Sequence, residues 1–315
     1  MVQLSERQTK PDVVVVGAAC LDIKGQIAGD IIAGTSNSGS VRISVGGCAR
    51  NVAENLARLG MHASLLSVVC QDDFGQTIVQ QTERAGVDTD HVLISCAQHS
   101  AAYMALLSPQ STLLVGVDDT AATSAITPSY IETHADLLRG ARMVVLDANV
   151  PLESSEVLLA ICNEAGVPVA LDPVAYAPAL RYRPLAGSFY LMTPNGVEAQ
   201  ALTGLPVANT AQGALAAKQL INAGVQIAII TLGQDGLVYA TGDANGYVPA
   251  IAVEGIDPTG AGDALTAAVV YALLNDIPVD EAVRLGVSAA TLTIESADTV
   301  RQDLSLESLY AQLVI

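Results

Sequence analysis

One acidic residue near the C-terminal end of the chain directly follows a run of small residues, in the stretch DPTGAGDALTAA at 257–268. Asp263 comes after Gly260, Ala261 and Gly262 and precedes an apolar, alanine-rich run, which predicts a helix that begins here. Backbone N–H groups at such a helix start are unobstructed and, with the positive end of the helix dipole, form an anion site. Asp263 could then accept a proton from a hydroxyl group while the amides stabilise a phosphoryl group in transfer. An acid favoured by the helix dipole, behind a glycine turn, is an equally open interpretation.

A second stretch, GGCARNVAENLARLG, places two glycines before another predicted helix. Gly46 and Gly47 allow a ligand to approach the backbone, and Asn51 in the first turn can both donate to and accept from ligand hydroxyls. An ordinary strand–turn–helix junction is the alternative. Arg50 and Glu54, four residues apart, are interpreted as an exposed ion pair on this helix.

The elements that must position these residues alternate between short apolar strands and amphipathic helices. Continuous β-branched runs are typical of strands buried on both faces of a parallel sheet, and the helical spacing between them predicts βαβ units. We therefore expect an α/β fold with a central, mostly parallel sheet and helices on both faces. The expected strands are 13–16, 64–69, 143–146, 167–171, 190–192 and 227–232, and the expected helices are 48–59, 156–165, 211–223 and 280–294.

Two segments interrupt this alternation. Residues 23–45 are rich in Gly and Ser, and 103–117 contain two strand-like runs around the turn-like Ser108-Pro109-Gln110-Ser111. We predict that segments from about 23–45 and 98–118 form a discontinuous antiparallel β lid on a single domain of residues 1–315. Exposed lid edges commonly pair with a second subunit, so a homodimer formed through the lid is expected.

Composition excludes several classes of partner. The net charge of −18 argues against a nucleic acid or an anionic membrane, and no apolar run approaches the length of a membrane span. The N-terminus lacks an apolar signal core, and the five cysteines contain no C-x-x-C pair, which together favour reduced thiols and a cytoplasmic protein. A P-loop motif is absent, and the G-x-G at 260–262 lacks the third glycine of a dinucleotide fingerprint.

Together the two glycine-containing stretches resemble the two signatures of the ribokinase/PfkB family of sugar and nucleoside kinases. TPNGVEA at 193–199 is similar to the family's N-x-x-E motif, TLGQDG at 231–236 to its nucleotide-side strand and turn, and GAACLDIKG at 17–25 to its first strand end. The resemblance runs from about residue 12 to 305. It implies a ribokinase-like fold with a β lid over the sugar, and a kinase that uses ATP and Mg²⁺.

The resemblance also implies a role for each matching residue. Asp263 would be the general base, and Gly260, Ala261 and Gly262 would donate backbone N–H groups to the phosphoryl group. The remaining roles concern the metal, the nucleotide, the sugar and a monovalent cation. They would be taken by Asn195 and Glu198 (Mg²⁺, through water, and ATP phosphates), by Thr231, Gly233 and Gly236 (nucleotide), by Asp22, Gly46, Gly47 and Asn51 (sugar hydroxyls), and by Asp257 (a monovalent cation such as K⁺).

Within the family, the first signature is most similar to the members that phosphorylate pseudouridine at its 5′-hydroxyl. LDANVPLES at 146–154 shares this similarity, so that Asn149 is expected to reach the substrate. Cys48 departs from the valine of that pattern, and we interpret it as a packed thiol. Ribose or another nucleoside is the alternative substrate, and a catalytically silent sugar-binding relative is a further alternative, because fold does not fix function.

Overall fold

The computed structural model describes residues 10–95, 99–110, 113–253 and 258–313. Its largest sheet has eight strands in the order β14-β13-β12-β11-β10-β9-β1-β4, and all of them run in one direction except β13, which pairs antiparallel with β12 and with β14. This confirms the expected α/β class. The strands are β1 (Val13–Val16), β4 (Ala63–Leu66), β9 (Met143–Asp147), β10 (Val169–Asp172), β11 (Leu191–Met192), β12 (Ile227–Thr231), β13 (Leu237–Thr241) and β14 (Asn245–Val248).

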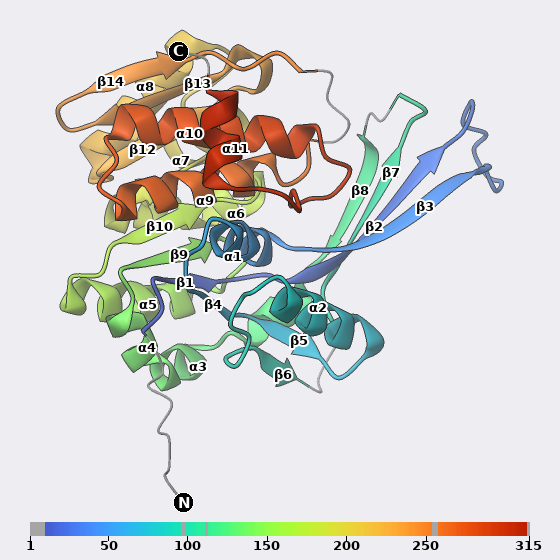
Figure 1. Cartoon of the computed structure of the whole chain (residues 1–315), viewed down its shortest axis with the longest axis horizontal. Coiled ribbons are helices and arrows are strands. Elements are labelled where there is room, and N and C mark those ends of the chain that lie inside the picture. The colour runs from blue at the N-terminus through green and yellow to red at the C-terminus, as the bar shows by residue number, and fades with distance from the viewer. Residues whose placement is uncertain (1–9, 96–98, 111–112, 254–257, 314–315) are drawn as a thin grey trace, which may run out of the picture.

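Helices cover both faces of this sheet because its central strands are apolar on both sides (Figure 1). Val14 and Val16 of β1 pack into one core, whereas Val13 and Val15 pack into the other. The first core is covered by α3 (Pro128–Thr133), α4 (Ala135–Gly140), α5 (Leu152–Ala165), α6 (Tyr176–Tyr182), α7 (Gly196–Thr203) and α8 (Thr210–Ala223). The second is covered by α1 (Cys48–Arg58), α9 (Ala261–Leu274) and α10 (Val279–Ile294), and α11 (Leu306–Gln312) packs on α10.

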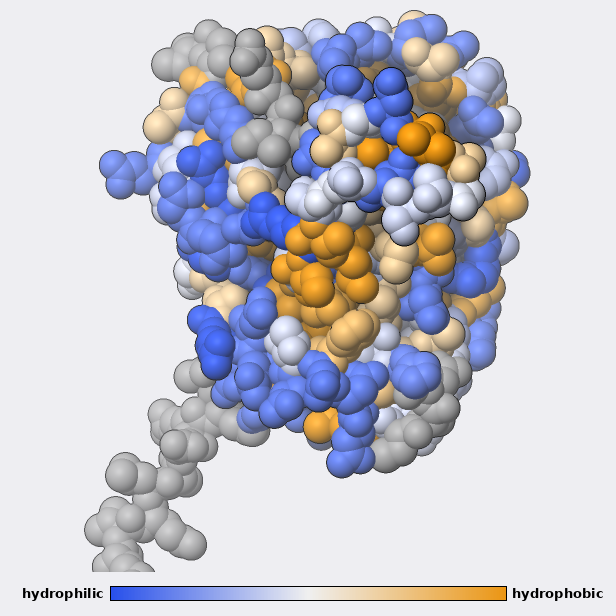
Figure 2. All heavy atoms as spheres, turned by 90° about the vertical axis from the view of Figure 1, so that its right-hand side faces the viewer, coloured by the Kyte–Doolittle hydropathy of each residue, from blue (hydrophilic) through white to orange (hydrophobic). Residues whose placement is uncertain are grey.

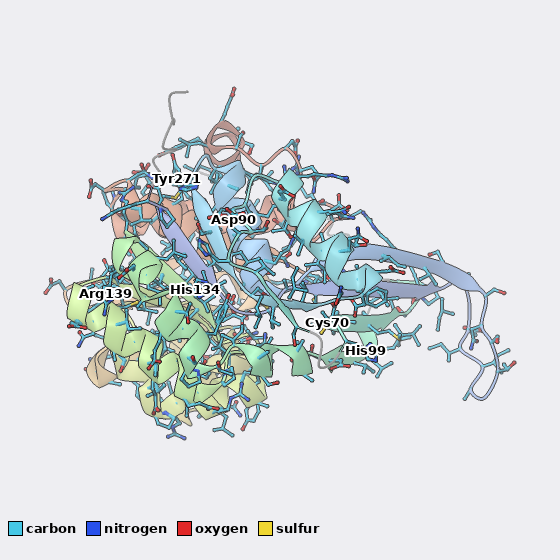
Figure 3. The ribbon with its side chains drawn as sticks, turned by 90° about the horizontal axis from the view of Figure 1, so that it is seen from below. Cys70, Asp90, His99, His134, Arg139 and Tyr271 are labelled. Carbon is cyan, nitrogen blue, oxygen red and sulfur yellow. The ribbon has the colours of Figure 1, made fainter. Side chains whose placement is uncertain are left out.

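The lid is a separate sheet that projects from one side of the body (Figures 1 and 3). It contains β2 (Cys20–Ile27), β3 (Gly39–Gly46), β7 (Ala102–Leu107) and β8 (Leu113–Asp119), in the order β3-β2-β7-β8. The expectation of a purely antiparallel lid is wrong in one pairing, because β2 and β7 are parallel. The reason is topological: β2 and β7 belong to two hairpins far apart in the sequence that enter the lid in the same direction.

The strand expected at 64–69 is divided in two. β4 ends at Leu66, and β5 (Val68–Cys70) pairs with β6 (Leu93–Ser95) in a small sheet of its own, beside α2 (Asp73–Arg84). Ser67 stands at the break, where its hydroxyl donates to the carbonyl of Gly17 at 2.6 Å. No described helix combines the length and apolar character that crossing a membrane requires.

Candidate active site

A pocket of about 440 Å³ lies between the lid, the N-termini of α1 and α9, and the carboxyl ends of β9 and β10. Ligands of open α/β sheets bind at this edge, because the loops and helix N-termini that follow parallel strands gather there. The pocket brings together most of the residues that the sequence singled out. They are Asp22, Gly47, Asn51, Asn149, Asn195, Glu198, Thr231, Gly260, Gly262 and Asp263.

Asp263 is the third residue of α9 and is 8% exposed. Its Oδ2 accepts a hydrogen bond from Nδ2 of Asn51 at 2.8 Å, which joins the two glycine-containing signatures across 212 residues of sequence. Burial, and then the negative charge of Asp172, raise the pKa of Asp263 well above its ordinary value. A buried carboxylate that is oriented by an amide and opens onto a pocket is a suitable general base.

The backbone before Asp263 forms a bend that only glycine adopts readily. Gly260 is the N-cap of α9 with φ 86°, and a Cβ there would lie 2.0 Å from the carbonyl oxygen of Thr299. A Cβ on Gly262 would meet nothing within 4 Å, and its N–H, as the second residue of the helix, has no acceptor within the helix. The Ala261 N–H donates to the carbonyl of Pro258 at 3.2 Å, and Ala261 does not line the pocket. The Gly262 and Asp263 amides are therefore the better-placed anion donors.

Two acids that the sequence did not single out lie beside this centre. Asp147 and Asp172 end the adjacent parallel strands β9 and β10, in register with one another. Asp147 accepts from the amides of Ala18 (2.7 Å), Ala49 (3.2 Å) and Asn149 (2.8 Å), so it fixes the start of α1 to the end of β1. Burial raises the pKa of Asp147 to about 7, although these amides act in the opposite direction.

Asp172 is the nearer of these two acids to the base. Its carboxylate, that of Asp263 and the Cys48 thiol have atoms that all lie within 4.8 Å of one another. Burial raises the pKa of Asp172, too. It is followed by Pro173 and by Val174, a β-branched residue with φ 66° that also lines the pocket. The sequence offered one signal, an acid directly followed by a proline at the end of a predicted strand, whereas the backbone strain at Val174 is visible only in the structure.

Asn195 and Glu198 begin α7 as a capping box. The Asn195 side chain accepts from the amides of Val197 (2.9 Å) and Glu198 (3.0 Å), while Glu198 accepts from the Asn195 amide (2.8 Å) and Nδ2 (2.6 Å). Both residues also line the pocket, so this local motif does not exclude a ligand role. Burial, and then the charge of Asp172, raise the pKa of Glu198 to about 7.

Of the three residues predicted to bind the nucleotide, one lines the pocket and two do not. Thr231 lines the pocket and donates its amide to the carbonyl of Pro194 at 3.0 Å. Gly233 and Gly236 do not line it: both have positive φ, 59° and 78°, and they shape the turn between β12 and β13. Their role in binding a nucleotide stays a prediction. Asp257, the predicted site of a monovalent cation, lies outside the described residues.

On the lid side, Asp22 is buried and its carboxylate occupies the space that a Cβ on Gly46 would fill, at 2.3 Å. Gly46 therefore makes room for Asp22 and does not itself line the pocket, whereas Gly47, with φ 98°, does. Asn149 also lines the pocket. Tyr103 and Asp118 of the lid also line the pocket.

All of the charged side chains among the described residues that line this pocket are acidic. Five carboxylates line it, and among the described residues no Lys, Arg or His side chain does so. Hard oxygen donors without a compensating cation are the ligand set that Mg²⁺ prefers. The polyanionic phosphates of a nucleotide would be repelled unless a cation entered with them. The donor set of the pocket thus fits a divalent cation.

Two expectations about α1 have different outcomes. The Arg50–Glu54 pair is not exposed: the two residues are 3% and 1% exposed and form a buried ion pair. The expectation was wrong because the lid root, α2 and the segment after α10 cover this side of the helix. Cys48 is half-buried, and burial raises the pKa of its thiol, as expected for a packed thiol and not for a reactive thiolate.

Several known kinases are similar to this chain in sequence or fold. The sequence is 31% identical over 301 residues to the pseudouridine kinase of Escherichia coli (strain K12), covering 95% of this chain and 96% of that protein. It is 25% identical over 288 residues to the guanosine-inosine kinase of Exiguobacterium acetylicum (91% and 95% covered). The structure of Arabidopsis thaliana ribokinase complexed with ribose and ATP superposes with a TM-score of 0.85 at 23% identity, covering 98% of this chain and 100% of that one. The profile of the pfkB family of carbohydrate kinases matches residues 10–304, and the chain belongs to that family.

Proposed function

We propose that the protein transfers a phosphoryl group from ATP to the 5′-hydroxyl of pseudouridine and forms pseudouridine 5′-phosphate. One observation carries the reaction type: Asp263, held by Asn51, stands at the amide-lined start of α9 inside a pocket whose only charged side chains among the described residues are acids. The substrate rests on the similarity to the pseudouridine kinase and on the polar groups of the lid. Ribose or another nucleoside is the second candidate, favoured by the other relatives.

Asp263 performs the proton transfer. The Asn51 amide donates to Oδ2 and orients the carboxylate, which would accept the proton of the acceptor hydroxyl. The raised pKa makes this carboxylate a stronger base than an exposed aspartate. The Gly262 and Asp263 amides, at the positive end of a fourteen-residue helix, stabilise negative charge on the phosphoryl group as it moves.

The remaining parts serve positioning and charge neutralisation, which dominate phosphoryl transfer. ATP would supply the phosphoryl group, and Mg²⁺, when bound, would neutralise negative charge on the phosphate oxygens. Glu198 and Asp172 would hold the cation, in part through water, while Thr231 and Asn195 line the nucleotide side. Asp22, Gly47 and Asn149 line the side where ribose hydroxyls would bind. The lid over them excludes water as a competing acceptor.

The lid offers a way to recognise the base. Tyr103 and Asp118 are register partners on the lid face that meets the pocket, and the Tyr103 hydroxyl lies above Gly116, where a Cβ would be 2.8 Å away. An aromatic ring can stack on a base, and a carboxylate accepts from an N–H. Pseudouridine, joined to ribose through carbon, carries at N1 an N–H that uridine lacks. Asp118 is proposed to accept it.

ADP release, measured with pseudouridine, uridine, inosine, adenosine, ribose and fructose, tests this proposal. Pseudouridine should give the highest kcat/KM, and release on ribose without release on pseudouridine would refute the substrate. Asp118→Ala should reduce the preference for pseudouridine over uridine by about tenfold, the worth of one charged hydrogen bond. Asp119→Ala is the matched control, because neighbouring strand residues point to opposite faces and Asp119 does not line the pocket.

We further propose that the outer lid face pairs with a second copy of the chain. Strand register places Ile43, Ile23, Met104 and Val117 in one row across all four strands. Several apolar side chains of this face are exposed, among them Val41 at 73% and Val117 at 59%, and Figure 2 shows an apolar patch on the side of the molecule where the lid projects. Such a patch is typical of an interface.

Sedimentation of two variants with neighbouring substitutions tests the dimer. Val41→Glu places a charge on the apolar lid face and should give monomers. Ser40→Glu adds the same charge to the other face of the same strand and should leave the assembly unchanged. Monomeric wild-type protein, or equal effects of the two substitutions, would contradict the proposal.

A further inference from the structure

A second pocket, of about 380 Å³, lies behind α1 at the root of the lid. Its walls come from β3, α1, the C-terminal end of α2 and residues 298–302. Four arginines line it: Arg42, Arg50, Arg58 and Arg84. These are four of only fourteen Lys and Arg residues in a chain of net charge −18. The active-site pocket carries the opposite charge, so this concentration is local and specific to the second pocket.

Existing carboxylates neutralise only half of this charge. Glu54 is shared between Arg50 and Arg58, and Asp298 pairs with Arg42. Arg84, exposed at the end of α2, pairs with no carboxylate among the described residues. With four guanidinium groups against two carboxylates, the lining has a net charge of two positive units. A doubly charged anion would match it.

Two of the four arginines, Arg50 and Arg58, are held in place by hydrogen bonds before any ligand arrives. Arg50 is 3% exposed; its Nε donates to Thr82 Oγ1 and its Nη1 to Asn51 Oδ1, both at 3.3 Å. The Arg58 Nε donates to Glu54 at 2.9 Å, and its Nη2 donates to the side chain of Gln302 at 2.6 Å. Guanidinium groups fixed in this way lose little side-chain entropy on binding, and their planar forks match phosphate oxygens.

We propose that this pocket binds the phosphoryl group of a small phosphorylated metabolite. The volume exceeds what one phosphate group needs, and Ser44, Gln81 and Thr299 line the remainder with groups that hydrogen-bond to hydroxyls. A phosphate monoester of a polyol or sugar therefore fits both the charge and the space. Inorganic phosphate carries the same charged group without the polyol, so it is the alternative ligand that the experiment must distinguish from a phosphate monoester.

The pocket is connected to the active site by direct contacts. Arg50 donates to Asn51, and Asn51 donates to the general base Asp263. On the opposite wall, Thr299 donates to the carbonyl of Val45 in β3 at 3.3 Å and backs onto Gly260. Without an anion, the like charges repel one another across the pocket. A bound anion removes this repulsion and holds together the lid root, the base and the anion donors, so we expect it to raise turnover.

Calorimetric titration of the full chain, saturated with Mg²⁺ and ADP to occupy the active site, tests binding. The probes are glycerol 3-phosphate, inorganic phosphate and glycerol. Glycerol 3-phosphate should bind at one site and glycerol should not. Tighter binding of glycerol 3-phosphate than of phosphate identifies a monoester site, and the reverse identifies a free-phosphate site. Binding of neither anion overturns the proposal.

Variants locate the site. Arg84→Gln should weaken glycerol 3-phosphate binding about tenfold or more and remove the rise in Tm that the ligand causes. Arg139→Gln is the matched control, because Arg139 is an exposed arginine of α4 on the side of the body away from the lid (Figure 3). Equal weakening in both variants would show non-specific charge and overturn the site.

Turnover tests the connection to Asp263. Glycerol 3-phosphate should raise kcat of the wild type and of Arg139→Gln over the concentration range in which it binds, and leave Arg84→Gln unchanged. An unchanged or lowered kcat in the wild type would overturn the connection. This readout rests on the proposed kinase activity; the calorimetric and Tm readouts do not, so failure of one is distinguishable from failure of the other.

Discussion

Replacing Asp263 by asparagine separates the chemistry of the carboxylate from its structural role. The substitution keeps the shape, and the new side chain's oxygen can still accept from Asn51, as Oδ2 does at 2.8 Å in the native protein. Its other end becomes an amide donor that cannot take a proton. We expect kcat to fall by about 10²–10⁴-fold, equivalent to about 3–5 kcal/mol of transition-state stabilisation. The coupled ADP-release assay at saturating substrate measures it.

The same substitution should stabilise the fold. Asp263 and Asp172 have oxygens within 4.8 Å, and two unit charges at that distance repel by about 3–4 kcal/mol at an effective dielectric constant of about 20. Because the folded-state pKa of Asp263 is raised, the native protein loses stability relative to the variant as pH rises from the ordinary value of 3.8 through the raised pKa. Below 3.8 the acid is protonated in both states, and the two proteins should differ little.

Urea unfolding at pH 5 and pH 8 measures this difference, and Asp119→Asn, which alters a carboxylate outside the pocket, is the control. The Asp263→Asn variant should gain stability over the wild type between the two pH values, whereas the control should not. Turnover within about fivefold of the wild type would refute the role of general base, for which the loss is about 10²-fold or more. A variant that is less stable than the wild type at pH 8 would refute the inferred repulsion.

Three further outcomes follow from the same site. Asp172→Asn removes a like charge, so the pKa of Asp263 should fall and the acid limb of the kcat/KM profile should move to lower pH; an unmoved limb would contradict the coupling. Gly260→Ala should lower the free energy of unfolding by about 1–3 kcal/mol, because alanine is strained at φ 86° and its Cβ would meet Thr299. Gly262→Ala should not destabilise the helix but should lower turnover, because the added methyl group would fill the space beside the anion-binding amides. Urea unfolding and kcat together distinguish the two variants. Chelation of divalent cations should stop ADP release, because the described lining of the pocket contains no cationic side chain, and activity that survives chelation would contradict this reading.

The sequence by itself predicted the buried strands of the main sheet and the two glycine-marked helix starts. Continuous Val runs such as Val13–Val16 have one stable place, the middle of a sheet covered on both faces, and the structure puts them there. Glycines before Asp263 and Asn51 marked the two helix starts, because the absence of a side chain is itself a local signal. These features depend on residues near one another in the chain.

Only the tertiary structure decided which distant residues meet. Asp147 and Asp172 looked like ordinary strand ends, and their place beside Asp263 follows from the order of strands in the sheet. Arg50 and Glu54 have the spacing of an exposed pair on α1, yet the lid root, α2 and residues 298–302 close over them. Helical spacing fixes which side chains share a face, but what covers that face depends on long-range packing, which is why the arginine pocket could not be predicted from the sequence.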